Sequence, residues 1–477
     1  MLRRMIPLLI TAVFLAAPLA AQDNGGGGGT ESFFSEDEES GGAPGSGSGA
    51  SASVGGKVEL ELRAFPDFDN FDDFAESPVT AVPRVNTELT FEGSQSEIVA
   101  DLEYSSRQRP LDNPEELINE AYMQLFYDNL DVEAGYIKTT WGTGDEVHVV
   151  DVLNPTDFTD SVNGEYSERK IAEKMVKLNV YTGMNGLLEL AYVPVLSQDR
   201  YALEGRWKPY RLEAMEEQLD AELEEAVLAG TLTSSEASTL ADQIAADAQT
   251  AHLPTELSDG QYGLRYSNSF GGVDLGAVYY FGFDRSPVVE IPESDPEDYT
   301  IHFDRLNLFG LEFATAVAGF NLRAEAAYNM TEDFDGDDPY VHNHSVAYMG
   351  GFDRDLPLSN LNVNIQGRGE YILDNDEVSD NGPRDADYDP GDNEHYWNNT
   401  LVASIKDDYK NETIKPSVDF VLTAETQDFL LRPGVEFVLA NDSTLNVRGS
   451  VFEGEEDTEF GQFDGNDHLE VSFEYAF

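Results

Sequence analysis

The feature that most constrains this chain is a two-residue hydrophobic repeat that runs from about residue 54 to the C-terminus. In the segment 54–65, apolar Val58, Leu60 and Leu62 alternate with charged side chains. Because successive side chains of a strand point to opposite faces, the repeat predicts strands with one apolar and one polar face. The polar face of the segment 360–372 consists of Asn, Gln, Arg and Glu. No soluble core could take that face.

The predicted strands are about ten residues long, and the repeat predicts about eighteen of them. They cover 54–65, 84–93, 97–105, 118–128, 130–139, 173–182, 186–193, 259–269, 273–282, 300–315, 319–329, 341–352, 360–372, 394–406, 412–422, 427–440, 443–453 and 467–477. Strands of soluble sandwiches are usually shorter, whereas ten tilted residues span the hydrocarbon layer of a membrane.

The connections between these strands alternate between short and long. Outer-membrane barrels show this asymmetry, with short periplasmic turns and long external loops. The sequence therefore predicts an all-β transmembrane fold: a closed antiparallel up-and-down barrel of about 18 strands, within a range of 16–20. An even strand count places both termini in the periplasm. The rival interpretation is a secreted, acidic, β-rich protein.

The C-terminal strand ends in an alternating aromatic row, Phe473, Tyr475 and Phe477. Here the sequence resembles the bacterial outer-membrane β-barrel proteins, in which such a terminal strand is the tag read by the outer-membrane assembly machinery. The resemblance implies that these three residues form an assembly signal. It also implies the outer membrane as location, with membrane lipid, lipopolysaccharide and the assembly machinery as partners.

The N-terminus has the pattern of a secretory signal peptide over residues 1–21. Two arginines precede the apolar run 5–15, and small residues lead to an expected cleavage near Ala21. A retained membrane anchor is the alternative. Residues 22–53 are Gly, Ser and acidic residues, which predicts a flexible periplasmic segment before a barrel over 54–477.

Charge and cysteine content exclude several classes of protein. The chain has 28 Lys and Arg against 92 Asp and Glu, a net charge of −64, and such a polyanion repels nucleic acid. Its 40% hydrophobic and 11% aromatic content is too high for a disordered acidic chain. Cysteine is absent, so disulfides, thiolate nucleophiles and a lipid-modified N-terminal Cys are excluded.

One internal segment resembles a second, narrower group. Trp141-Gly142, followed by Asn154-Pro155-Thr156-Asp157, is similar to a W-G then N-P-x-D pattern in a poorly characterised group of large Gram-negative outer-membrane barrels of porin-like type. The resemblance supports the barrel and indicates where a loop lies, but it implies no substrate.

The loop 140–172 combines carboxylates with apolar residues that favour packing over exposure to solvent. We expect it to fold back into the barrel mouth, although an external flap packed on neighbouring loops is the alternative. The candidate constriction residues are Trp141, Asp145, Asp151, Asn154 and Asp157.

A barrel of about 18 strands is wide enough to enclose an aqueous lumen. Strand parity places six arginines on the polar, lumenal face. They are Arg63, Arg265, Arg323, Arg368, Arg432 and Arg448. Two interpretations remain open: a charged constriction that selects solutes, with arginines facing an acidic loop, or a network of lumenal salt bridges that only satisfies inward charges.

The insertion 208–251 has helical rather than strand periodicity. Leu219, Leu223 and Val227 recur at helical spacing, Gly230 offers a stop, and Thr233-Ser-Ser-Glu236 matches a capping box. We expect a helical hairpin on the external side of the barrel. Its apolar faces would pack on each other and on adjacent loops, or bind a partner.

Metal and enzyme chemistry have weak signals. The acidic loop 374–392 could collect Ca²⁺ or Mg²⁺ and bridge to lipopolysaccharide, or could simply be a solvated surface, and no other cofactor is expected. His342 and His344 share one face of a predicted strand and form either two metal ligands or a polar pair. No hydrolase or phosphate-binding motif is present, so we expect no enzyme, although a Ser/His/Asp set assembled from separate strands would escape this test.

These features together predict a porin or channel for passive or selective diffusion of small polar solutes, with a preference for cations set by the acidic mouth and internal carboxylates. The alternative function is a plugged barrel that acts as a surface structural or interaction protein through its large external loops.

Overall fold

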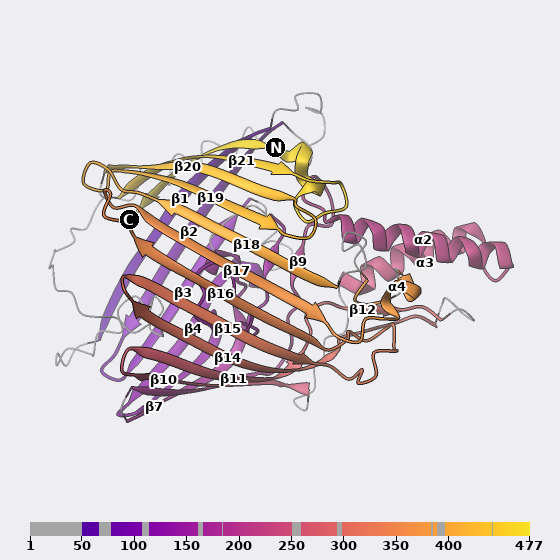
Figure 1. The fold of residues 1–477 in the computed structure, drawn as a ribbon, viewed down its shortest axis with the longest axis horizontal. Coiled ribbons are helices and arrows are strands. Elements are labelled where there is room, and N and C mark those ends of the chain that lie inside the picture. The colour runs from indigo at the N-terminus through magenta and orange to yellow at the C-terminus, as the bar shows by residue number, and fades with distance from the viewer. Residues whose placement is uncertain are drawn as a thin grey trace.

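The computed structural model describes residues 50–65, 78–106, 114–160, 166–183, 185–249, 259–292, 298–382, 385–388, 396–440 and 442–477. Within these ranges, eighteen strands form one antiparallel sheet that closes into a barrel (Figure 1). The strands are β1 (Ser51–Ala64), β2 (Val79–Glu92), β3 (Ser96–Ser105), β4 (Ile118–Tyr127), β5 (Leu130–Ile137), β7 (Glu173–Thr182), β8 (Gly186–Val193), β10 (Gln261–Phe270), β11 (Val273–Phe283), β14 (Arg305–Val317), β15 (Phe320–Met330), β16 (Ser345–Asp355), β17 (Asn362–Ile372), β18 (Trp397–Lys406), β19 (Ile414–Thr423), β20 (Phe429–Ala440), β21 (Ser443–Glu453) and β22 (His468–Ala476).

The barrel closes between its first and last strands. Strand β22 pairs with β1 in a register that sets Phe473 opposite Leu60, and the backbone of Phe477 exchanges two hydrogen bonds with Gly56. Every barrel strand is antiparallel to its neighbours, so the predicted fold class is confirmed. Strand β1 begins at Ser51. The predicted signal peptide and nearly all of the predicted flexible segment, residues 1–49, lie outside the described residues.

The two faces of the barrel wall are the reverse of a soluble fold. Outward side chains are apolar and exposed, as at Leu60 (45%) and Leu311 (63%), whereas inward side chains are charged and buried, as at Arg63 (1%). Because an exposed apolar belt is stable only against hydrocarbon, this arrangement fits a membrane barrel. None of the helices that the structure describes is long and apolar enough to cross a membrane.

The long loops gather at one end of the barrel, and the C-terminus lies at the other (Figure 1). The loop end carries α4 (Val378–Asn381) and the two-stranded ribbon of β12 (Val288–Glu290) and β13 (Thr300–His302). The prediction of one strand over 300–315 was therefore wrong at its start, because residues 300–302 pair with β12 and β14 begins only at Arg305.

The prediction that His342 and His344 lie on a strand was also wrong, since β16 begins at Ser345. Loop carboxylates capture the backbone before the strand starts: Asp304 accepts a hydrogen bond from the amide of His342, and Asp387 from that of Asn343. These side-chain bonds replace the ladder bonds of a strand.

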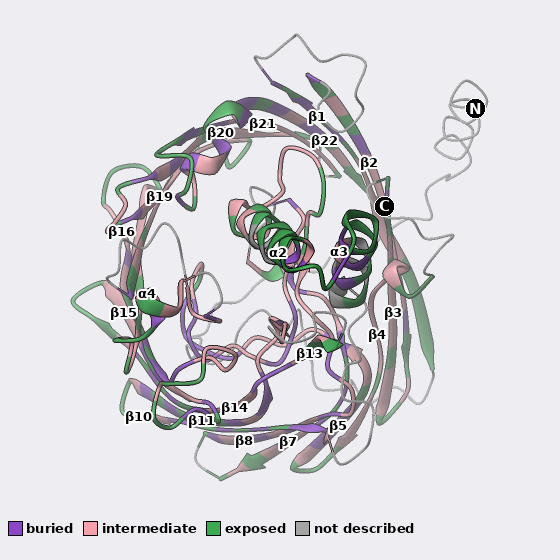
Figure 2. Cartoon of the chain, turned by 90° about the vertical axis from the view of Figure 1, so that its right-hand side faces the viewer, coloured by how far each residue is buried: buried purple, intermediate pink, exposed green. Residues whose placement is uncertain are grey.

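The predicted helical hairpin is present as α2 (Tyr210–Ala229) and α3 (Ser234–Gln249). Gly230 ends α2 in the left-handed conformation, and Thr233 and Glu236 exchange the reciprocal bonds of a capping box. The helices bury Leu223, Leu240 and neighbouring side chains against each other and lie over the barrel mouth in the end-on view (Figure 2). The hairpin also packs on the β12–β13 ribbon.

Candidate functional site: the barrel lumen

The loop that follows β5 is packed inside the barrel. Trp141 is completely buried against β10, where a Cβ atom on Gly263 would lie 2.5 Å from its indole ring. Val150 covers Gly310 of β14 in the same way, with a corresponding distance of 2.6 Å. Because both glycines occupy inward positions of the wall, the loop lies in the lumen. Figure 2 shows chain segments inside the ring of strands.

One wall carboxylate, Glu325 of β15, holds the tip of this loop. Its Oε1 accepts hydrogen bonds from the amides of Thr143 (2.6 Å) and Gly144 (2.9 Å), and its Oε2 accepts one from Val149 (2.8 Å). His148 Nδ1 lies 3.3 Å from the same carboxylate. The loop tip therefore wraps around one buried charge. The sequence indicates Glu325 only as one of many inward acids.

Two of the predicted constriction residues shape the loop itself. Asn154 donates to the carbonyls of Ile137 (2.7 Å) and Ile171 (3.0 Å) and accepts from the amide of Thr139 (2.9 Å), which closes the base of the loop. Asp151 is buried within the loop, where it accepts a hydrogen bond from the amide of Trp141.

The buried side of Asp151 is completed by Tyr166 and Lys170. The Tyr166 hydroxyl donates to Asp151 over 2.8 Å, and the Lys170 ammonium forms an ion pair with the same carboxylate. Burial first, and then the Asp151 charge, raise the pKa of Tyr166 well above its ordinary value. Asp151 and Asn154 therefore hold the loop fold, and neither faces a lumenal arginine.

Asp145 and Asp157 do reach arginines. Asp145, at the loop tip, pairs with wall residue Arg323 at 2.9 Å and accepts from Asn364. Asp157 pairs at 3.1 Å with Arg200, which belongs to another loop rather than to the wall. Of the five predicted constriction residues, only Asp145 therefore touches the predicted lumenal wall through an ion pair.

Sequence reasoning missed a second inward segment, residues 194–207. Its short strand β9 (Arg200–Tyr201) pairs with β6 (Asp157–Phe158) of the first loop. At its far end the Arg206 guanidinium stacks 4.0 Å above Phe65 at the end of β1. The segment therefore runs from β8 across to β1. No repeat marks it in the sequence; Trp207, which packs on the same aromatic cluster, is the only local signal.

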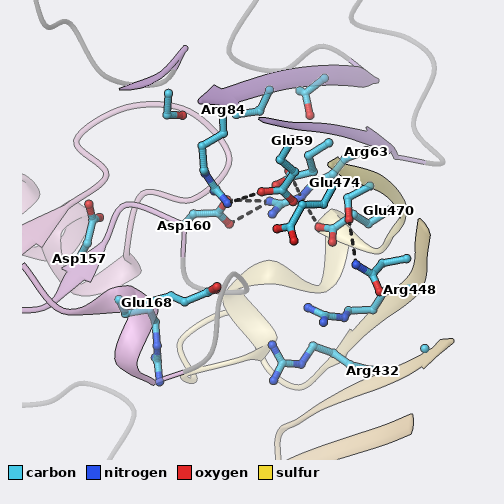
Figure 3. A pocket seen from close by; sticks show the side chains of 18 of the residues that line it. Glu59, Arg63, Arg84, Asp157, Asp160, Glu168, Arg432, Arg448, Glu470 and Glu474 are labelled. Atoms are coloured by element: carbon cyan, nitrogen blue, oxygen red, sulfur yellow. Dashed lines mark hydrogen bonds and ion pairs between the residues drawn. The ribbon is translucent and has the colours of Figure 1, made fainter. Parts of the chain in front are cut away.

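The six predicted wall arginines differ in how they are paired. Arg63 binds Glu61, Asp160 and Glu470, Arg265 binds Glu189 and Glu312, and Arg323 binds Asp145 and Asp353. Arg368 makes a long 3.5 Å contact with Glu370, and its side chain is 47% exposed. Arg432 and Arg448 project into a cavity from adjacent strands (Figure 3).

The two inward segments divide the lumen unequally. The first loop packs on the wall from β5 to β17, the filled half, where buried Val278, Leu308, Ala327 and Met349 form a core with it. The second segment starts in this half, with Leu196 against Phe283, before it crosses the lumen. Opposite the filled half lies the open half, formed by β1–β4 and β19–β22, which lines a cavity of about 1370 Å³. This cavity is large enough for small solutes.

The cavity is lined by charges of both signs. Its acidic residues are Glu59, Glu61, Asp101, Glu103, Glu116, Glu146, Asp157, Asp160, Glu168, Glu204, Asp407, Asp408, Asp419, Glu436, Glu470 and Glu474. Its basic residues are Lys57, Arg63, Arg84, Lys138, Arg169, Arg200, Arg206, Lys406, Lys415, Arg432 and Arg448. Among the lining residues that the structure describes, acids outnumber bases by 16 to 11, a much smaller excess than the 92 to 28 of the whole chain.

The remaining predicted sites lie elsewhere. Phe473, Tyr475 and Phe477 are exposed on the outer face of the barrel. His342 and His344 do not meet a common ligand: His342 binds Asp304, and His344 contacts the Tyr328 hydroxyl. Among the described residues, no group of three or more His, Asp and Glu is placed to hold a metal ion.

No family model matches the chain, and no curated protein matches it either. Solved structures that are similar include a triple mutant of Rhodopseudomonas blastica porin (10% identity, TM-score 0.39), covering 90% of this chain and 100% of that one. Pseudomonas aeruginosa OccK11 is 8% identical with a TM-score of 0.46, covering 90% and 96%. The outer membrane channel DcaP of Acinetobacter baumannii is 11% identical with a TM-score of 0.42, covering 90% and 98%. These likenesses are weak, so the case for a channel rests on this chain's own residues.

Proposed function

We propose that this protein is an outer-membrane channel for passive or selective diffusion of small polar solutes. The observation that carries the proposal is the open half of the lumen: a charged cavity of about 1370 Å³ inside a closed barrel whose outer face is apolar. A wall built only for stability needs no such space, since inward charges can be satisfied by close pairing, as they are in the filled half. The proposal assigns the chain no enzymatic activity.

The same cavity supports a preference for cations. Its lining has five more acids than bases, and the low-dielectric wall concentrates their field within the passage. The preference is moderate, because eleven basic side chains share the cavity with the acids.

The location that fits this function is the bacterial outer membrane, with the loop end outside and both termini in the periplasm. Lipid and lipopolysaccharide would surround the apolar belt, and the assembly machinery would read the exposed row of Phe473, Tyr475 and Phe477. Deleting Phe477 is then expected to reduce the amount of heat-modifiable barrel recovered from outer membranes. Binding of Ca²⁺ or Mg²⁺ by the 374–392 loop stays a prediction.

Single-channel recording of the purified protein in planar bilayers tests the function directly. We expect stepwise conductance in KCl and a reversal potential that indicates moderate cation preference. Deleting residues 143–160, which contain most of the lumenal part of the first loop, should raise the conductance. A folded, heat-modifiable barrel that conducts no ions would contradict the channel.

That last outcome would favour the alternative, a plugged barrel that acts through its external loops. Two observations support this alternative: segment 194–207 runs across the lumen, and α2 and α3 lie over the mouth (Figure 2).

A further inference from the structure

The cavity of the open half collects basic side chains in a protein that has few of them. Counting only the described residues, it holds eleven Lys and Arg side chains, in a chain that has 28 in all. Five of them form ion pairs with carboxylates: Lys57, Arg63, Arg84, Arg200 and Lys415. Arg84 binds Glu59 at 2.8 Å, for example, and Lys415 binds Glu436 at 2.9 Å. The basic residues that are not matched in this way therefore stand out.

Arg448 of β21 is one of them. The carboxylate opposite it in the strand register, Glu470, binds Arg63 at 2.9 Å. Among the described residues, Arg448 forms no ion pair and donates no side-chain hydrogen bond. Its half-buried guanidinium points into the cavity (Figure 3). A charge in this position is available to a solute.

Arg432 of β20 lies beside it. The register aligns Arg448 with Gly434, two residues along β20 from Arg432 on the same inward face. Figure 3 shows both guanidiniums projecting into the cavity, apart from the acidic group around Glu59 and Glu470. Two like charges at neighbouring positions repel each other, and an anion between them would relieve that repulsion.

A third guanidinium comes from the inward loop. Arg169, in the short helix η3 (Ser167–Arg169), lines the same cavity, and its buried Nε has no hydrogen-bond acceptor within the described part of the chain. Arg432 lies in the electrostatic fields of Arg448 and Arg169, and also in those of Asp419 and Glu146. Arg432 stands opposite Asp419 of β19 in the strand register, so its own charge has a carboxylate beside it. Arg448 and Arg169 add further guanidiniums to the same cavity, within a protein whose net charge is −64.

We propose that Arg169, Arg432 and Arg448 form a binding subsite for the oxyanion group of a small solute, a carboxylate or a phosphate. Guanidinium forks match both groups because they donate two parallel hydrogen bonds in the plane of the oxygens. The inference rests on the proposed channel function and names its substrate class: solutes that carry an oxyanion bind here during passage, while the acidic remainder of the cavity favours small cations.

Binding is measured first, without any requirement for conduction. Isothermal titration calorimetry of the detergent-purified, full-length mature barrel uses sodium succinate and sodium phosphate as probes, against sodium chloride of equal ionic strength. We expect saturable binding of at least one probe. Which probe binds distinguishes a carboxylate subsite from a phosphate subsite, and binding of neither would overturn the proposal.

The matched variants are Arg432→Gln with Arg448→Gln, compared with Arg368→Gln. Arg368 lies on the lumenal face outside this cavity, and its loss removes the same kind of charge. Loss of hydrogen bonds to a charged group should weaken binding roughly tenfold or more in the double variant and leave the Arg368 variant unchanged. Heat-modifiable migration verifies that each variant is folded. An equal loss of affinity in the double variant and in the Arg368 variant would show that the effect comes from general lumenal charge. That result would overturn the subsite.

Single-channel recording separates this inference from the channel itself. We expect the binding probe to reduce the KCl current of the wild type and to affect the double variant roughly tenfold less. A barrel that binds the probe but conducts nothing would refute the channel and keep the subsite. A barrel that conducts normally but neither binds nor is blocked would refute the subsite alone.

Discussion

The filled and open halves of the lumen are built from the same alternating strands, yet one is packed like a protein core and the other encloses a cavity. In the filled half, inward positions carry small or apolar residues such as Gly263, Gly310 and Ala327 beside a few buried carboxylates. In the open half, inward positions carry long charged residues such as Glu59 and Arg84. The difference shows that the size of inward side chains, and not the repeat itself, decides where a loop can settle.

In the filled half, one buried carboxylate binds the tip of the loop. Glu325 satisfies three loop amides that would otherwise be buried without an acceptor. In the open half the carboxylates pair with wall or loop cations and leave space between them.

Replacing Glu325 with Ala should have the largest effect. Loss of a buried carboxylate that accepts three amide hydrogen bonds should cost roughly 3 kcal/mol or more of the free energy that holds the loop. We expect noisy, enlarged single-channel currents and faster proteolysis within residues 140–172. The control is Glu370→Ala, another lumenal carboxylate, which accepts from Ser345 rather than from the loop. Quiet currents of wild-type size from the Glu325 variant would refute the anchoring role.

Replacing Gly310 with Val should have the second-largest effect. The new side chain would overlap Val150 and push the loop from the wall, at a cost of roughly 1–3 kcal/mol. The channel conductance should change while the barrel remains heat-modifiable. Gly350→Val serves as the control, because no atom lies within 4 Å of a Cβ built at that glycine. If both variants conducted alike, the small wall residues would not be what seats the loop.

Neutralising Asp145 and Asp157 to Asn should reduce the cation preference by about twofold or less, because both contribute to lumenal charge among many other acids. The reversal potential in a KCl gradient gives the measurement. Asp374→Asn with Asp376→Asn removes two exposed acids from a long loop outside the strands, and physiological salt should screen them. A larger shift of the reversal potential from the Asp374 and Asp376 substitutions would mean that charge at the barrel mouth sets the cation preference. Asp151 is unsuitable for the test, since it holds the loop fold.

The smallest effect should come from pH at the loop end of the filled half. Burial lowers the pKa of His342, but its hydrogen bond to Asp304 and the charges of Asp284 and Asp387 outweigh this and raise the pKa to about 9. Because the folded-state pKa lies above the ordinary value of 6.5, the stabilisation is complete below about pH 6.5 and is lost as pH rises through 9.

The loss of stability should be local, and hydrogen exchange of loop amides near Asn343 between pH 6 and 10 measures it. In His342→Gln the intrinsic rise of exchange with pH should remain, whereas the additional rise near pH 9 should be absent. If the exchange rate showed the same additional rise near pH 9 in the wild type and in His342→Gln, a group other than His342 would be responsible.

Much of the barrel could be predicted from the sequence, because a dyad repeat allows each strand few alternatives. A register slip of one residue would turn charged side chains such as Arg265 into the hydrocarbon. The helical hairpin could also be predicted, from the helix stop at Gly230 and from the capping box. The starts of β14 and β16 could not. Residues 300–302 pair with β12 instead of extending β14, and loop carboxylates far away in the sequence capture the backbone amides before β16.

The partners of the charged residues inside the barrel could not be predicted from the sequence. The pattern placed Arg63, Arg432 and Arg448 on one face without showing that Arg63 has three carboxylate partners while Arg448 has none among the described residues. It treated Asp145 and Asp151 alike, although the first reaches the wall and the second is buried within its own loop.

The sequence by itself determined a closed barrel of about 18 strands, because the alternation of apolar and polar residues is local and each strand carries it independently. Only the tertiary structure decided which half of the lumen is filled and which charges remain available in the other. Those outcomes depend on contacts between residues as distant in the sequence as Gly142 and Glu325, or Arg63 and Asp160, which only the closed barrel brings together.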